Sequence, residues 1–160
     1  MKERKLLSVI GMLVLISCGS GGFKLSGSIS GQISNSSFGP QYGIAKPLSN
    51  GSGTYVVISN TPVPCDIPFQ IGTDGCRYAS AADGTYAAIE LFDAASRNAN
   101  VYFAWIEDGG CSGSGPGWGA AHDATSGTIS IDGENASITI EMSSTNGDSL
   151  IGQFTVHYCK

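Results

Sequence analysis

Short runs of alternating apolar and polar residues dominate this chain, and they are clearest in its last third. Residues 128–131 and 138–142 both alternate in this way, and the turn signal Asp132-Gly133 lies between them. Side chains alternate between the two faces of a strand, so this pattern predicts a β-hairpin. The same alternation at 154–158 predicts a final strand that ends at Cys159.

Earlier parts of the chain carry weaker strand signals, at 25–33, 55–59, 67–71, 86–92 and 101–106. The last of these is apolar at every position, as expected for a central strand that is covered on both faces. Apolar residues at helical spacing with a charged opposite face are missing from the sequence. We expect an all-β fold of about seven to eight strands, arranged as a single antiparallel β-sandwich of the Greek-key or immunoglobulin-like type, with a small β-barrel as the alternative.

The composition supports this expectation and excludes some partners. Glycine, serine and threonine are frequent and only 13% of the residues are charged, which favours turns and strands over helices. The formal net charge of −5 argues against nucleic acid as a partner and against electrostatic binding to anionic lipid. The length suits one hydrophobic core, so we expect a single domain at 24–160.

The N-terminal segment follows the pattern of a secretory signal peptide. It begins with the basic residues Lys2, Arg4 and Lys5, continues with an apolar stretch at 6–16, and has a small residue at the end. The apolar stretch is too short to span a bilayer. We therefore expect residues 1–17 to be a signal peptide that directs export.

The end of this segment, Leu15-Ile16-Ser17-Cys18, resembles the lipobox of bacterial lipoproteins. In that family the chain is cut before the cysteine, whose thiol is acylated, so the resemblance implies a membrane anchor at Cys18 and a flexible tether at 18–23. Gly19 stands where an aspartate often marks inner-membrane retention, which implies the outer membrane of a bacterial envelope. The alternative is an ordinary signal peptide that is cut near Gly19 or Gly22.

Four further cysteines bear on the domain itself. Disulfides persist in exported proteins, and an even number of cysteines there indicates two bridges. The spacing leaves all three pairings open. A zinc site is disfavoured, because the spacing of two to four residues that zinc ribbons use does not occur. The four cysteines are Cys65, Cys76, Cys111 and Cys159.

A wider resemblance covers about half of the chain after Cys18. Residues 84–86, 126–131 and 147–159 are similar to a series found in small β-rich bacterial lipoproteins of unassigned function. The similar positions are mostly glycines and strand residues, so the resemblance concerns fold and implies no active site. It implies two pairs of cysteines, namely Cys65 with Cys159 and Cys76 with Cys111. The pair Cys65 with Cys76, which would close a local hairpin, is the rival.

The candidate binding residues lie in a long segment at 107–126, which we expect to be a loop. Trp118 is a candidate platform for stacking on a sugar or a peptide, with His122 and Asp123 as polar contacts. A binding site usually needs several placed polar groups in a pocket, so a glycine-rich surface loop is the favoured interpretation. We expect neither a metal nor a cofactor here.

Catalytic patterns do not emerge from the sequence. The Gly-x-Ser-x-Gly elbow of α/β-hydrolases is missing, and the carboxylates show no readable paired spacing. His157 is expected to face solvent on the last strand. We therefore expect no enzyme but a lipid-anchored envelope protein with a structural or ligand-binding role, whose partner would be another envelope protein or a glycan. The alternatives are a secreted carbohydrate- or peptide-binding module and, less favoured, a hydrolase.

Overall fold

A computed structural model describes the chain at 22–48, 51, 53–66, 70–72, 75–77, 83–91, 99–107, 110–114, 122–144 and 147–160. All the regular secondary structure in these ranges consists of β-strands, which confirms the all-β prediction. A helix that is long and apolar enough to cross a membrane is not found in this part of the chain.

More strands are present than the sequence patterns predicted. Short strands with glycine or proline, such as β3 and β9, have weak patterns and were missed. In chain order the strands are β1 (Ser26–Ile33), β2 (Ser36–Phe38), β3 (Tyr42–Pro47), β4 (Thr54–Ser59), β5 (Gln70–Gly72), β6 (Gly75–Arg77), β7 (Gly84–Leu91), β8 (Ala99–Glu107), β9 (Gly110–Ser114), β10 (His122–Asp132), β11 (Asn135–Ser144) and β12 (Ser149–Tyr158).

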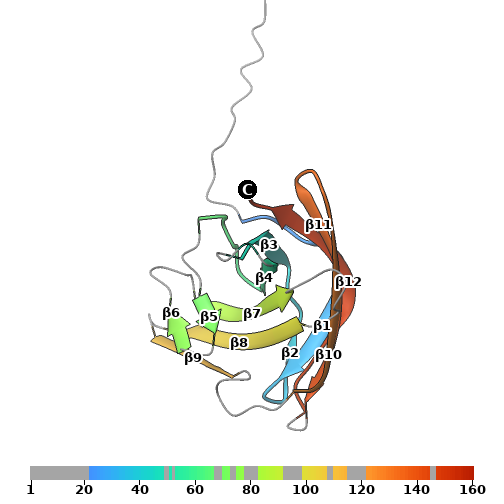
Figure 1. Cartoon of the computed structure of the whole chain (residues 1–160). Coiled ribbons are helices and arrows are strands. Elements are labelled where there is room, and N and C mark those ends of the chain that lie inside the picture. The colour runs from blue at the N-terminus through green and yellow to red at the C-terminus, as the bar shows by residue number, and fades with distance from the viewer. Residues whose placement is uncertain are drawn as a thin grey trace, which may run out of the picture.

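One sheet contains all of these strands except β5 and β6, which pair only with each other. Its order is β10-β11-β12-β3-β4-β7-β8-β9, with β1 paired to β12 and β2 paired to β1. The sheet curls on itself, so that β10, β11 and β12 face β4, β7 and β8 (Figure 1). The architecture is therefore one curled, mixed sheet that forms a half-barrel, which agrees with the all-β prediction but does not confirm its sandwich arrangement.

Strand β12 joins the two halves of this sheet. It pairs along its length with β11 on one side and with β1 on the other. At its C-terminal end it pairs with β3, where His157 is opposite Ile44 and Tyr158 is opposite Ala45. This last pairing is parallel, whereas the sequence patterns led us to expect antiparallel pairing throughout.

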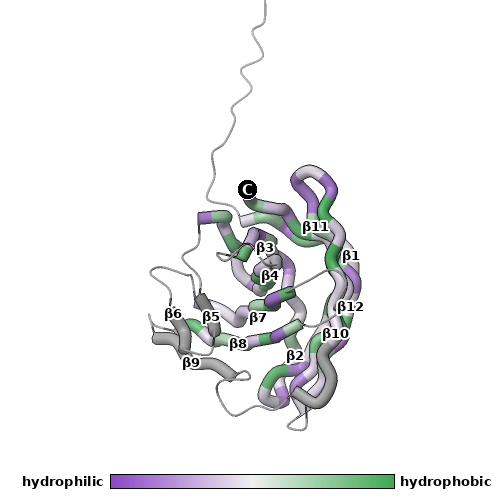
Figure 2. The backbone as a smooth tube through the Cα atoms, in the orientation of Figure 1, coloured by the Kyte–Doolittle hydropathy of each residue, from purple (hydrophilic) through white to green (hydrophobic). Residues whose placement is uncertain are grey.

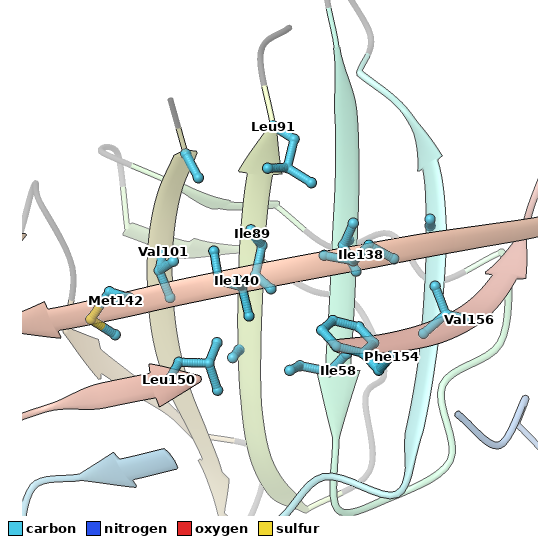
Figure 3. Close-up of a cluster of buried hydrophobic side chains, with 14 of the residues drawn as sticks. Ile58, Ile89, Leu91, Val101, Ile138, Ile140, Met142, Leu150, Phe154 and Val156 are labelled. Carbon is cyan, nitrogen blue, oxygen red and sulfur yellow. The ribbon is translucent and has the colours of Figure 1, made fainter. Parts of the chain in front are cut away.

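The main core fills the space inside the curl. Ile138, Ile140 and Met142 of β11 are almost completely buried, as their alternation predicted. Figure 3 shows β11 crossing over β4, β7 and β8, so that these side chains meet Ile58 and Ile89 from the opposite half of the sheet. The turn between β10 and β11 is polar and projects beyond the core (Figure 2).

A second core lies on the outer face of β3, β4, β7 and β8. Val57, Tyr86 and Tyr102 are buried there, together with Cys159 and with Val63 from the segment that follows β4. All the side chains of β4 are consequently buried. Strand β8 is covered on both faces, as predicted for the apolar run at 101–106.

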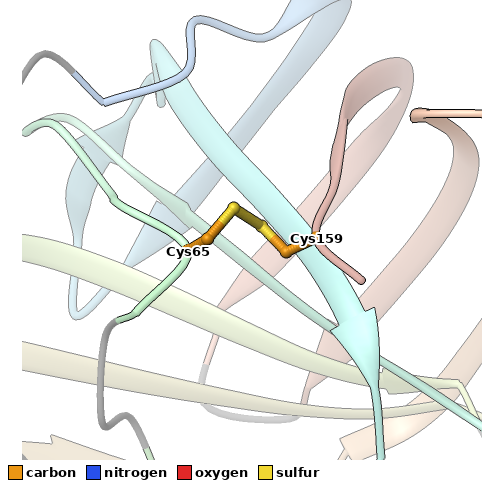
Figure 4. Close-up of a disulfide and its surroundings, with 2 residues drawn as sticks. All are labelled: Cys65 and Cys159. Atoms are coloured by element: carbon orange, nitrogen blue, oxygen red, sulfur yellow. A yellow bond between two sulfur atoms is a disulfide. The ribbon is translucent and has the colours of Figure 1, made fainter. Parts of the chain in front are cut away.

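The disulfide between Cys65 and Cys159 closes this second core (Figure 4). The two Cα atoms are 5.7 Å apart, although 94 positions separate the residues in the sequence. This is the pairing that the wider resemblance implies, and it excludes the rival pair of Cys65 with Cys76. Closing a loop of this length restricts the unfolded chain, an effect worth about 4 to 5 kcal/mol in the chain-entropy model.

Strand β12 can approach β1 closely because of Gly152. A Cβ atom at this position would lie 2.3 Å from the carbonyl oxygen of Ser28 and 2.6 Å from the Cα of Ile29, both backbone atoms of β1. Backbone cannot move aside as a flexible side chain can. The pairing of β1 with β12 therefore requires glycine here.

We expect Gly152→Ala to lower the free energy of unfolding by about 1 to 3 kcal/mol, because the added methyl group overpacks the β1–β12 contact. Gly39→Ala is the matched control, since nothing lies within 4 Å of a Cβ at Gly39. Urea unfolding of both variants measures the difference. Equal midpoints for the two variants would show that β1 does not approach β12 as described.

Candidate functional site

The cluster with the most reactive side chains lies at the C-terminal end of β12. Cys159 follows this strand directly, Cys65 comes from the segment after β4, and Phe23 comes from the segment before β1. The ligand atoms of Cys65, His157 and Cys159 all lie within 4.8 Å of one another. Cys159 is buried, whereas Cys65 and His157 are half-buried.

His157 is fixed by an aromatic contact. Its ring stacks on the ring of Phe23, with the centroids 4.0 Å apart and an interplanar angle of 14°. Phe23 is itself tied to the sheet, because its carbonyl oxygen accepts a hydrogen bond of 2.9 Å from the backbone N–H of Gly43. The imidazole is thus held against the disulfide by the first residues of the domain.

Backbone hydrogen bonds fix the end of β12 from both sides. The N–H of Cys159 donates to the carbonyl oxygen of Ala45 at 2.7 Å, and the N–H of Tyr158 donates to that of Glu134 at 2.8 Å. The cluster is therefore attached by hydrogen bonds to β3 and to the β10–β11 turn.

A row of polar and aromatic side chains crosses β3, β4, β7 and β8 on the face of the second core. The register places Lys46 opposite Tyr55, Tyr55 opposite Glu90, and Glu90 opposite Asn100. The Lys46 amine lies 5.8 Å above the Tyr55 ring. A carboxylate oxygen of Glu90 accepts hydrogen bonds from the Tyr102 hydroxyl at 3.1 Å and from the Asn100 amide at 3.5 Å.

Burial governs the protonation of this row. It lowers the pKa of Lys46, because desolvation penalises the charged amine. It also raises the pKa of Tyr102 to about 12, with further contributions from the negative charge of Glu90 and from the hydrogen bond to it. Tyr55 and Tyr102 are only 6% and 3% exposed, so the row is a structural network and offers no open aromatic surface to a ligand.

The outer face of β10, β11, β12 and β1 carries rows of hydroxyl groups. Ser130 is opposite Ser137, Ser137 is opposite Thr155, and Thr155 is opposite Ser26. Ser137 and Thr155 share a hydrogen bond of 3.1 Å. The next row consists of Thr128, Thr139, Gln153 and Ser28, all exposed. These two rows form an uncharged surface, which we call the hydroxyl face.

The structure places only some of the residues that the sequence singled out. Cys18 and Trp118 lie outside the described residues. His122 and Asp123 belong to the start of β10, at the end of the β10–β11 hairpin opposite to His157. The expected loop at 107–126 was wrong in extent, because β9 and the first residues of β10 form within it.

The second predicted disulfide concerns Cys76 in β6 and Cys111 in β9. The positions of their side chains are outside what the structure describes. The backbones of β6 and β9 do lie in contact, which is compatible with this pair. The pairing of Cys76 with Cys111 therefore stays a prediction.

Sequence reasoning missed the position of His157 beside the disulfide, where its side chain is half-buried. The expectation of a solvent-facing histidine took account of its strand but not of Phe23 or Cys65. A signal was present, since His157 and Cys159 are two residues apart and such residues point to the same face of a strand.

The chain matches no protein-family model, no curated protein and no solved structure.

We expect the free energy of unfolding to fall as the pH rises from about 10 to about 12. An unfolded tyrosine releases its proton near pH 10, whereas folded Tyr102 keeps its proton up to about pH 12, so the folded state binds more protons in this window. Urea unfolding at several pH values measures the decline. Tyr102→Phe should reduce its slope, and an unchanged slope in this variant would contradict the assignment.

Proposed function

We propose that the protein is an exported bacterial lipoprotein, anchored in the cell envelope through Cys18, with a structural or partner-binding role and no enzymatic activity. The observation that carries this proposal is that hydrogen bonds tie the chain into the domain from Phe23 onward, only five positions after Cys18. The lipobox supplies the anchor, and the fold supplies a rigid domain that begins directly behind it.

The distance between anchor and domain is short. Phe23 is bonded to Gly43, and the N–H of Leu25 donates to the carbonyl oxygen of Gln41 at 3.0 Å, so the chain is part of the domain from Phe23 onward. Only residues 19–22 remain between Cys18 and this point, and the five residue steps from Cys18 to Phe23 span at most about 18 Å. An acylated Cys18 would hold the domain close to the membrane surface.

The disulfide supports export. A bridge between distant positions such as Cys65 and Cys159 persists in oxidising compartments and is rare in the cytosol. Export through the segment at 1–17 would bring the domain into such a compartment. The signal segment and the disulfide are independent features, and both favour the same location.

The use of the polar side chains supports a role other than catalysis. Glu90 accepts hydrogen bonds from Tyr102 and Asn100, and the buried Asp148 accepts one from the Ser34 N–H at 2.7 Å. Tyr86 bonds to Thr61 through its hydroxyl at 2.8 Å. Groups that are bound in this way stabilise the fold.

The intact mass of the protein extracted from bacterial membranes tests the anchor. We expect a chain that begins at Cys18 and carries added acyl mass. Cys18→Ala should remove the acyl mass and block the cut, whereas the neighbouring Ser20→Ala should leave both unchanged. A chain that begins at Gly19 or Gly22 without lipid would contradict the proposal and favour a secreted protein.

A second candidate function, binding of an envelope glycan, rests on the hydroxyl face. Hydroxyl and amide groups exchange hydrogen bonds with sugars readily, and the absence of charge within the two rows suits a neutral or weakly charged polymer. The strands space these groups regularly, since neighbouring strands are about 4.8 Å apart. A flat glycan could contact several of them at once.

We expect the protein to co-sediment with purified peptidoglycan sacculi if the hydroxyl face binds glycan. The double variant Thr128→Val and Thr139→Val keeps the shape of both side chains and removes their hydroxyls, so it should weaken binding at least threefold. Ser37→Ala on β2, another exposed hydroxyl, is the control. Equal binding of both variants and the unchanged protein would remove this candidate.

A further inference from the structure

The disulfide between Cys65 and Cys159 has a third potential metal ligand beside it. The imidazole of His157 lies within 4.8 Å of both sulfur atoms. Two thiolates and a neutral imidazole are the ligand set that zinc uses in sites with three protein ligands and one open position. As long as the sulfur atoms are bonded to each other, they are not available as thiolates.

We propose that reduction of this disulfide converts Cys65, His157 and Cys159 into a binding site for a zinc-class divalent ion. The cluster would then have two states: a covalent bridge when oxidised, and a metal bridge when reduced. Both states join the segment after β4 to the end of β12. The inference goes beyond the lipid anchor and does not depend on it.

The chemistry of the conversion is a thiol–disulfide exchange followed by metal binding. A dithiol reductant donates two electrons and two protons, so the bond between the two sulfur atoms breaks and the reductant becomes a disulfide. Zn²⁺ then displaces the two protons from the thiols to solvent and binds two thiolates and one imidazole nitrogen. The two negative charges of the thiolates balance the charge of the ion.

The distances require little movement. Zn–S bonds are about 2.3 Å and Zn–N bonds about 2.0 to 2.1 Å, so tetrahedral ligand atoms lie about 3.4 to 3.8 Å apart. The three ligand atoms already lie within 4.8 Å, and the Cα atoms of the two cysteines are 5.7 Å apart. Side-chain rotation can open the two sulfur atoms to this separation while the strands stay in place.

The surroundings favour a neutral complex. Cys159 is 7% exposed and belongs to the second core with Ile44 and Val63. Separate thiolates are costly in such apolar surroundings, whereas a thiolate pair neutralised by Zn²⁺ is not. Phe23 acts as a positioning residue, because its stacking holds the His157 ring beside the sulfur atoms.

Cobalt binding to the reduced protein tests the proposal, since Co²⁺ replaces zinc and gives an absorption band when thiolates bind it. All proteins carry Cys18→Ser, so that this thiol does not contribute, and are reduced with a dithiol that is removed before titration. We expect a thiolate–cobalt band that Zn²⁺ abolishes by competition. His157→Asn should weaken binding at least tenfold.

The second histidine of the chain is the matched control. His122 lies at the opposite end of the β10–β11 hairpin, so His122→Asn should bind cobalt as the unchanged protein does. The double variant Cys65→Ser and Cys159→Ser should lose the band, whereas a band that came from Cys76 and Cys111 would survive this change. Equal affinity of the two histidine variants, or a band that survives the double serine change, would overturn the proposal.

Reduction also removes the stabilisation that the disulfide provides, so the reduced chain could unfold. Circular dichroism then measures whether the chain regains its β-sheet structure. Zn²⁺ should then restore the β-sheet signal, because binding to the folded state stabilises it. The His157→Asn variant should need at least tenfold more Zn²⁺ for the same recovery. Recovery without this difference, or no recovery at all, would contradict the site.

Discussion

The bonds at the C-terminal end of β12 hold the two halves of this fold together. β12 pairs with β11 and β1 on the side of the main core, and its last residues pair with β3. The N–H of Cys159 then donates a hydrogen bond to the carbonyl oxygen of Ala45 in β3, and the disulfide links Cys159 to Cys65 in the segment after β4. The end of β12 therefore closes the curled sheet around the main core and also links this sheet to the second core.

Much of the fold could be predicted where the pattern is local. The strands around Asp132-Gly133 and the strand that ends just before Cys159 follow from alternation, because each has one more buried and one more exposed face. The parallel pairing of β12 with β3 could not be predicted, since it joins distant positions and β3 contains Gly43 and Pro47 in a short run. The curled single sheet depends on this pairing.

The candidate site shows the same division between local and distant information. The cysteine count indicated bridges, but the partner of Cys65 followed only from the wider resemblance. The contact of His157 with Phe23 and the disulfide depends on three segments that are far apart in the sequence. Spacing rules for zinc detect ligands within one short segment, so they could not detect this cluster.

Peptide mapping of the unreduced protein by mass spectrometry tests the central claim most directly. The protein is digested without reduction, and the peptides that remain joined through sulfur are identified. The account predicts that the peptide containing Cys65 is joined to the peptide containing Cys159. A peptide pair in which Cys65 is joined to Cys76 would contradict it, because the end of β12 would then lack its link to the second core.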